Sequence, residues 1–222
     1  MNLTGLLYYL SVGSELLPPL MLLRTPSRDP GRLKVALLCL VWFAIDVVAT
    51  VQGSLTHGSN LWVAYLLDPV QAIIVFWLLD GWQLSWMSRL ALRLLLPIYL
   101  VAVAALTLLF ESSDHFGLLT TTLTSSMLLG VVGYTMITRI RAHPSKLLDQ
   151  EWVWICCGLA LNFGLEAGFT PLLRRLMSQK PPGPPYLEFI RDVRFVANLV
   201  VMLLMARGMV CAERPQRPAA LS

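Results

Sequence analysis

Four acidic residues and one arginine stand inside long apolar runs of the sequence. The acids are Glu15, Asp46, Asp68 and Glu166, and the arginine is Arg194. An ionisable side chain inside a bilayer costs ~2.5 kcal/mol or more, so such groups need partners and often mark proton, ion or ligand sites. A carboxylate can exchange a proton or hold a cation, and a guanidinium pairs with carboxylates or anionic ligands. These five residues are therefore candidates for binding chemistry.

Uncharged polar residues share helix faces with these charges. The neighbours are Gln71 three positions after Asp68, Asn162 four before Glu166, and Asn198 four after Arg194. Side chains with these spacings lie on one face of a helix, and lipid cannot hydrogen-bond a polar face, so these faces should point into a bundle. The predicted ligand- or ion-binding residues are Glu15, Asp46, Asp68, Gln71, Asn162, Glu166, Arg194 and Asn198. The run Thr120–Ser126 is also rich in hydroxyls, and we expect it partly to pack against a neighbour and partly to line a cavity.

The charged candidates are expected at a common depth. At 1.5 Å per residue from the basic ends of the spans, they lie about 12 to 21 Å inside the membrane. We expect them to converge on Arg194, with Glu166 as its first partner and Asp68 as its second. Four acids outnumber one arginine, so some carboxyl groups should be protonated. Two interpretations stay open: polar contacts that fix helix register, or a pocket for a ligand, proton or ion.

The elements that carry these residues are long apolar segments. Of the 222 residues, 56% are hydrophobic and 14% are charged, and the mean hydropathy is +0.67. Soluble chains carry roughly 25% charge, so a soluble domain is excluded. About 20 apolar residues cross a bilayer as a helix. The predicted spans are 3–23, 34–55, 61–80, 90–110, 117–138, 152–173 and 187–208. The fold is thus predicted as all-α: one transmembrane domain over 1–210 and a short cytoplasmic tail over 211–222.

Lys and Arg alternate between the connections. They occur in the first, third and fifth loops and in the tail, whereas loops 56–60 and 111–116 have none. This pattern predicts an N-terminus outside and a C-terminus in the cytoplasm. Loop 172–188 goes against the pattern with Arg174, Arg175 and Lys180. The net charge of +4 thus reflects topology, and no nucleic-acid partner is expected.

Prolines interrupt several spans. Pro18-Pro19, Pro69, Pro97 and Pro171 each remove a helical hydrogen bond. Pro69 follows Asp68 directly, and Pro18 comes three residues after Glu15. A carbonyl freed beside a carboxylate favours a cation or proton site or a hinge, and a simple kink is the alternative.

Cysteines and histidines do not indicate catalysis. Cys156 and Cys157 are adjacent in a span and should pack as small apolar residues, while His57, His115 and His143 fall in loops. Neither a metal site nor a histidine base within the membrane is expected. Retinal is excluded as a cofactor because the last span has no lysine, and no other cofactor is expected.

Several short motifs resemble those of small uncharacterised bacterial heptahelical membrane proteins. They are Tyr8-Tyr9 followed by Glu15 and Pro18, then Asp46, Asn60-Leu61-Trp62 and Asn198. The resemblance implies the seven-helix architecture and no activity.

Three functional interpretations follow. The first is a small sensor, receptor-like protein or accessory subunit with a polar pocket near the bilayer midplane. The second is a proton- or cation-coupled transporter of a small solute, with Asp68 and Glu166 as protonatable residues and Arg194 as counter-ion. The third is an intramembrane enzyme acting on lipid, which lacks support because no nucleophile stands beside a base. The expected partners are the bilayer, other membrane subunits and an unidentified small ligand or ion, and the expected location is a bacterial inner membrane.

Overall fold

The computed structural model describes residues 3–24, 29–56, 62–109, 118–142, 147–179 and 184–211. In these ranges, the side chains of 53–56, 62–64, 118, 170, 173–179 and 184–188 are not described. The three histidines, Lys180 and the tail after Cys211 lie outside the described residues, and so do the side chains of Arg174 and Arg175.

All the regular secondary structure in the described part of the chain is helical, and these residues form no strand. The elements are α1 (Leu3–Ser14), α2 (Leu17–Arg24), α3 (Pro30–Thr56), α4 (Trp62–Trp82), α5 (Trp86–Leu109), α6 (Leu118–Ala142), η1 (Leu147–Asp149), α7 (Glu151–Gln179) and α8 (Pro184–Val210). Seven segments, with α1 and α2 together forming the first, are long and apolar enough to cross a membrane. The seven predicted spans are thus confirmed as helices, and their ends agree within four residues except at one place.

The exception is the end of α7, which continues to Gln179 rather than stopping near residue 173. Pro171 lies inside this helix. A proline removes one backbone hydrogen bond, but it leaves the following residues free to remain helical. The apolar pattern marks only the part of a helix that suits lipid, so the more polar extension was not predicted.

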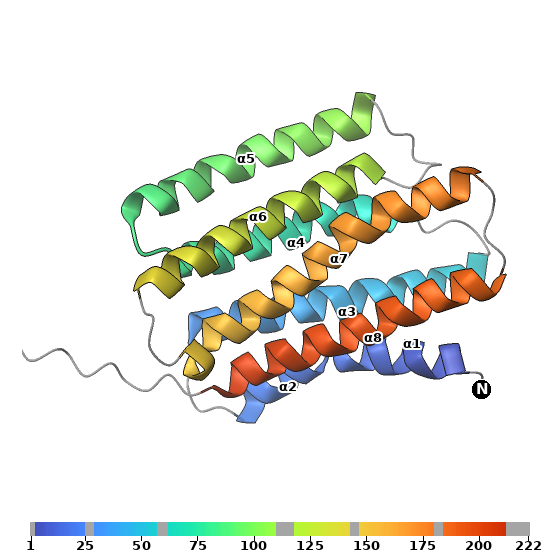
Figure 1. Cartoon of the computed structure of the whole chain (residues 1–222), viewed down its shortest axis with the longest axis horizontal. Coiled ribbons are helices and arrows are strands. Elements are labelled where there is room, and N and C mark those ends of the chain that lie inside the picture. The colour runs from blue at the N-terminus through green and yellow to red at the C-terminus, as the bar shows by residue number, and fades with distance from the viewer. Residues whose placement is uncertain are drawn as a thin grey trace, which may run out of the picture.

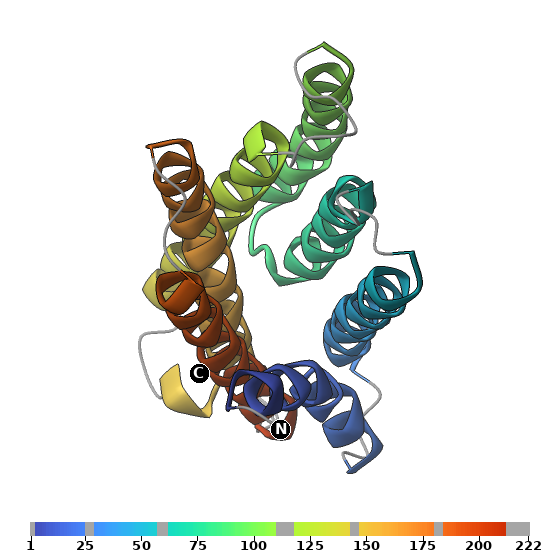
Figure 2. The same ribbon diagram turned by 90° about the vertical axis from the view of Figure 1, so that its right-hand side faces the viewer.

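The helices run nearly parallel or antiparallel along the long axis of the molecule (Figure 1). Their neighbour relations form a closed circuit: α1 and α2 pack against α8 and α3, α3 packs against α4, α4 against α6, α6 against α7, and α7 against α8. Helix α5 lies outside this circuit and contacts α4 and α6 (Figure 2). Helices α3 and α8 are therefore joined mainly through α1 and α2.

One end of the bundle collects the arginines and is called the basic end below. Here α2 ends at Arg24, α6 ends beyond Arg139 and Arg141, and α8 ends beyond Arg207. It is the end at the left of Figure 1, away from the N-terminus.

The apolar core extends from the middle of the helices towards the basic end. Its largest fully buried apolar side chains include Leu38, Leu79, Phe163, Met205 and Met209. Beyond this core, in the half away from the basic end, no described residue of α3 after Trp42 or of α7 after Phe163 is buried. In α8, none between Arg191 and Val200 is buried. The packing of three helices therefore loosens in one half of the bundle.

Candidate functional site

The first of the seven segments long enough to cross a membrane is broken at Glu15. Helix α1 ends at Ser14 and α2 begins at Leu17, and the amides of Glu15 and Leu16 donate to the carbonyls of Val12 and Gly13 over three residues instead of four. Pro18 and Pro19 have no amide hydrogen, so they cannot complete the helical hydrogen bonds across this point. The break places an acidic side chain at a change of helix direction inside an apolar segment.

The Glu15 carboxyl group is buried, with a side chain only 4% exposed. Its Oε1 accepts a hydrogen bond from Asn198 Nδ2 at 3.1 Å, and the same amide donates to Ser11 Oγ at 2.9 Å. No N–H or hydroxyl group donates to its Oε2. The neighbouring ionisable group is the carboxyl of Asp46 on α3, which lies within hydrogen-bonding reach of the Glu15 carboxyl. Two acids from different helices thus face each other and can share a proton or a cation.

Arg194 on α8 interacts with acids on both sides. Its Nη2 lies 4.0 Å from Glu166 Oε1, and it also interacts electrostatically with Asp46. Ser125 Oγ donates to Glu166 Oε2 at 2.9 Å. Asp46 is on α3 and Glu166 on α7, so the interactions of Arg194 link α8 with two other helices. The Arg194 side chain is 72% exposed. The guanidinium predicted at the centre of the site is therefore paired with Glu166 but is not buried.

We call this group the Arg194 cluster. Its members are Ser11, Glu15, Asp46, Ser125, Glu166, Arg194 and Asn198. They come from α1, the break before α2, α3, α6, α7 and α8, so residues far apart in sequence meet at one level. Five of the eight predicted site residues are brought together here. If all its acids are ionised, the cluster has three negative charges and one positive charge.

Asp68 and Gln71 belong to a second group, the Asp68 cluster. Gln71 Nε2 donates to Asp68 Oδ1 at 3.2 Å, and Thr121 Oγ1 donates to Asp68 Oδ2 at 2.9 Å. Trp42 Nε1 donates to Gln71 Oε1 at 3.0 Å. Asp68 and Gln71 are both buried, and this hydrogen bonding joins α3, α4 and α6. The expectation that all the acids share one site is therefore met only in part, because hydroxyl and amide donors surround Asp68.

Asn162 is the remaining predicted residue. It is half-buried on α7, one turn before Glu166, and it has no hydrogen bond with any described residue. Its position on the Glu166 face agrees with the predicted stripe, but the geometry assigns it no contact.

Helix α6 supplies hydroxyl groups in three directions, which the list of candidate residues did not contain. Thr121 bonds Asp68 on α4, Ser125 bonds Glu166 on α7, and Thr124 Oγ1 forms a 2.8 Å hydrogen bond with Tyr99 OH on α5. The hydroxyl-rich run 120–126 was the available signal. Its spacing could not show which hydroxyl meets which acid, because that depends on helix rotation.

The basic end is closed by a different set of polar contacts. Arg32 Nε pairs with Glu151 Oε2 at 2.7 Å, and Arg32 Nη2 donates to the carbonyl of Cys211 at 2.6 Å. Gln83 Nε2 donates to Thr135 Oγ1 at 2.8 Å. These contacts link α3 with α7 and the end of α8, and the α4–α5 connection with α6.

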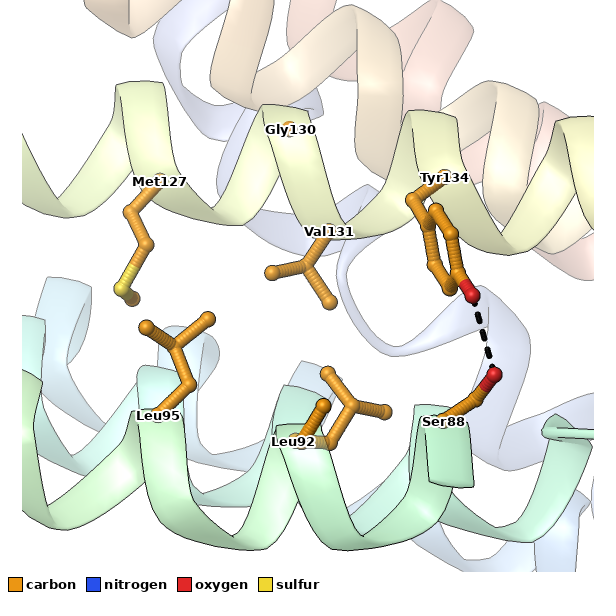
Figure 3. A pocket seen from close by; sticks show the side chains of 8 residues that line it. Ser88, Leu92, Leu95, Met127, Gly130, Val131 and Tyr134 are labelled. Carbon is orange, nitrogen blue, oxygen red and sulfur yellow. Dashed lines mark hydrogen bonds between the residues drawn. The ribbon is translucent and has the colours of Figure 1, made fainter. Parts of the chain in front are cut away.

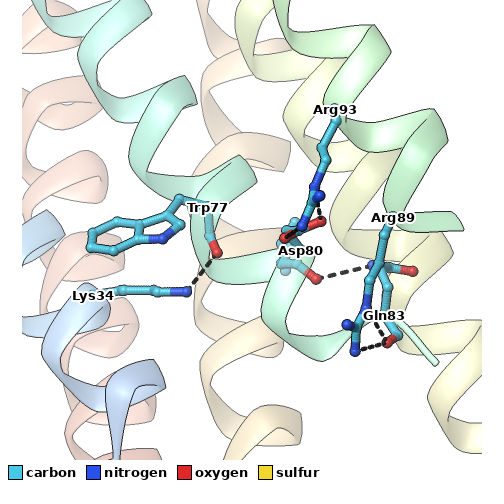
Figure 4. A network of polar contacts seen from close by, with 7 residues as sticks. Lys34, Trp77, Asp80, Gln83, Arg89 and Arg93 are labelled. Carbon is cyan, nitrogen blue, oxygen red and sulfur yellow. Dashed lines mark hydrogen bonds and ion pairs between the residues drawn. The ribbon is translucent and has the colours of Figure 1, made fainter. Parts of the chain in front are cut away.

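A more exposed network covers the same end around Asp80. Arg93 donates to both carboxyl oxygens of Asp80, at 3.2 and 2.9 Å, and Arg89 donates to the carbonyl of Gln83 (Figure 4). Lys34 lies 4.6 Å from the centre of the Trp77 ring and donates to the carbonyl of the same residue. The arginines counted from sequence as topology signals thus also hold helix ends together.

A metal centre is not indicated by the described residues, in which no three His, Cys, Asp or Glu side chains form a group suited to one. No protein-family description, no curated protein and no solved structure matches this chain.

Proposed function

We propose that this chain is a small integral membrane protein of the sensor, receptor-like or accessory-subunit type, and that it binds a small cationic ligand or ion at the Arg194 cluster. The observation that carries the proposal is the close approach of two carboxyl groups from different helices, Glu15 and Asp46, which lie within hydrogen-bonding reach of each other. No N–H or hydroxyl group donates to Glu15 Oε2. Two facing carboxylates repel each other, and a cation or a donor group of a ligand between them would remove that cost.

The charges of the cluster favour a cation. When they are ionised, Glu15, Asp46 and Glu166 outnumber the single Arg194, which already lies beside Glu166. An ammonium group or inorganic cation between Glu15 and Asp46 would offset this excess in place of a proton. Asn198 would hold the Glu15 carboxyl in place through its existing hydrogen bond. The loose packing of α3, α7 and α8 at this level offers a route for the ligand from the end opposite the basic end.

The test is a measurement of thermal unfolding of the full chain in lipid nanodiscs. Ammonium, methylammonium, sodium and potassium chlorides are each titrated against N-methylglucamine chloride at constant ionic strength. A cation that binds the folded state stabilises it by about 2.7 kcal/mol at 100 times its Kd. We expect a saturable rise in melting temperature with at least one cation.

Variants locate the effect. Glu15→Gln and Asp46→Asn should abolish the rise, whereas Asp80→Asn, which removes an acid paired with Arg93 at the basic end, should keep it. A rise that persists in the Glu15 and Asp46 variants, or no rise with any of the four cations, would contradict the proposal.

A proton- or cation-coupled transporter is the second candidate, and the break at Glu15 favours it. Discontinuous helices near the bilayer midplane form the substrate and ion sites of many transporters. In proteoliposomes with an enclosed pH dye, this function requires proton movement that Glu15→Gln stops and Asp80→Asn does not. A sensor would leave the internal pH unchanged in the original protein, in Glu15→Gln and in Asp80→Asn.

The proposed setting is the plasma membrane of a bacterium, with the basic end in the cytoplasm. The alternation of Lys and Arg among the connections supports this orientation. An epitope tag at the N-terminus should then be accessible to antibody on intact spheroplasts, and a tag at the C-terminus only after permeabilisation. The opposite result would reverse the orientation.

A further inference from the structure

Helices α5 and α6 are held together at two points with a groove between them. Ser88 Oγ and Tyr134 OH are 2.9 Å apart near the basic end, and Tyr99 OH and Thr124 Oγ1 are 2.8 Å apart deeper in the bundle. The groove has a volume of about 410 Å³. Figure 3 shows its walls, with apolar side chains of the two helices facing each other and Tyr134 meeting Ser88 at one end.

The walls of the groove are almost wholly apolar. Leu92 and Val131 form the floor and are only 5% and 7% exposed, while Leu95 and Met127 line the part farther from the basic end. Gly130 contributes no side chain, and a Cβ placed there would meet nothing within 4 Å. The groove therefore remains open because a glycine stands where a larger residue would fill it.

The length and lining of the groove suit part of an acyl chain. Its lining residues run from Ser88 to Leu95 on α5 and from Met127 to Tyr134 on α6, seven residue steps on each helix, which is about 10 Å. This is about a third of the ~30 Å thickness of a hydrocarbon core, so the groove lies within the depth of one leaflet.

The polar end of the groove lies near an exposed positive charge. Arg141 is exposed on the same face of α6 as Tyr134, two turns closer to the helix end. Arg89 follows Ser88 in the sequence, but its guanidinium donates to the carbonyl of Gln83. The nearby acid Asp80 is already paired with Arg93 through both of its oxygens. A phosphate at this end would meet the hydroxyls of Ser88 and Tyr134 and the exposed guanidinium of Arg141.

We propose that the groove binds one acyl chain of an anionic phospholipid, with the lipid phosphate at the Ser88–Tyr134 end beside Arg141. The chain lies along Leu92, Leu95 and Met127 and points towards the Tyr99–Thr124 pair. The site is separate from the Arg194 cluster and does not depend on its proposed function.

Native mass spectrometry of the full chain tests the acyl-chain part of the proposal. The delipidated protein is mixed with phosphatidylglycerol or with phosphatidylcholine of the same acyl chains, and retained lipid is counted. Phosphatidylglycerol should be retained at one molecule per chain. Gly130→Leu should weaken retention by about tenfold or more because its side chain occupies the groove.

Gly133→Leu is the matched control, because its Cβ also meets nothing within 4 Å while Gly133 does not line the groove. It should retain lipid as the original protein does. Equal melting temperatures of the two variants would show that both fold. Unchanged retention in Gly130→Leu, or a cross-linked second copy of this chain in the groove, would overturn the proposal.

The phosphate part is tested by charge removal. Arg141→Gln should reduce the preference for phosphatidylglycerol over phosphatidylcholine several-fold, and Arg24→Gln, an exposed arginine at the end of α2, should leave it unchanged. Equal retention of the two lipids by the original protein would overturn the assignment of an anionic headgroup.

Discussion

At the scale of single residues, two ion pairs of the basic end differ sharply in burial. Arg32 and Glu151 are 4% and 3% exposed, whereas Arg93 and Asp80 are 67% and 23% exposed. Removing one partner of a buried pair leaves an uncompensated charge, which costs about 3–5 kcal/mol. Glu151→Gln should therefore lower the free energy of unfolding by this amount, measured by denaturant titration in mixed micelles.

The exposed pair provides the control. Asp80→Asn should change the free energy of unfolding by no more than about 1 kcal/mol, since water screens the pair. Replacing Arg32 and Glu151 together by methionine should restore much of the stability lost in Glu151→Gln, because neither charge then remains buried. Similar small effects from Glu151→Gln and Asp80→Asn would contradict the importance of burial.

Cys211 follows α8 directly and gives a prediction about pH. Burial raises the pKa of the Cys211 thiol, the positive charge of Arg207 opposes this shift, and Glu151 and Asp149 add to it. A raised pKa leaves less thiolate at a given pH, so alkylation should be slower in the folded protein. The midpoint of the iodoacetamide rate against pH, measured in a Cys157→Ser background, should lie higher in the folded chain than in the chain unfolded in SDS. A midpoint at or below that of the unfolded chain would mean that Arg207 outweighs burial.

At the same scale, the sequence indicated the acids of the site better than their partners. Glu15, Asp46, Glu166 and Arg194 stand out because charges in apolar runs are rare, and their interactions agree with a shared level. Arg32 was counted only as a loop charge, because the predicted span began after it. Its burial depends on where α7 and α8 end in space, and no periodicity within α3 contains that information.

At the scale of helices, α7 and α8 approach closely through two glycines. A Cβ at Gly158 would lie 2.8 Å from Met205 Cγ and 3.2 Å from the carbonyl of Val201, and one at Gly208 would lie 2.6 Å from Ile155 Cγ1. The clash at Gly158 involves backbone, which cannot move aside alone. Gly158→Ala should therefore destabilise the protein by about 1–3 kcal/mol, measured as the free energy of unfolding.

Gly168 lies on the same helix α7 and serves as the control. A Cβ there would meet nothing within 4 Å, so Gly168→Ala should be neutral or stabilise by up to ~1 kcal/mol through higher helix propensity. If both alanine variants were equally stable, the close packing of α7 against α8 would be disproved.

The helices themselves were largely predictable, and their rotations were not. Length and hydropathy decide where a helix crosses the apolar layer, which is why the seven segments agree with the predicted spans. Gly130 and Gly133 on α6 both face open space, while Gly158 on α7 and Gly208 on α8 make close contacts. Which glycine meets a neighbour depends on tertiary contacts that one sequence does not encode as a pattern.

At the scale of the whole molecule, tight packing and candidate chemistry occupy different halves. The Arg32–Glu151 pair, the Gly208 contact and the apolar core hold the half near the basic end, whereas Asp46, Glu166 and Arg194 lie where the packing loosens. The proposed binding site would use this combination, because the rigid half fixes the helices that carry the Arg194 cluster while the looser half admits a ligand. Regions with few buried contacts also open at lower free energy.

Hydrogen exchange of α7 in nanodiscs tests this division. Amides 164–169 should exchange faster than amides 152–163, because the described residues after Phe163 are not buried whereas Ile155, Leu159 and Phe163 are. Lipid around the helix would protect both segments equally, so a difference between them requires water inside the bundle beside Glu166. Addition of the cation that raises the melting temperature should slow exchange of amides 164–169 and leave that of amides 152–163 unchanged. Equal protection of the two segments would mean that lipid or protein fills the loose half, and the Arg194 cluster would then have no aqueous route.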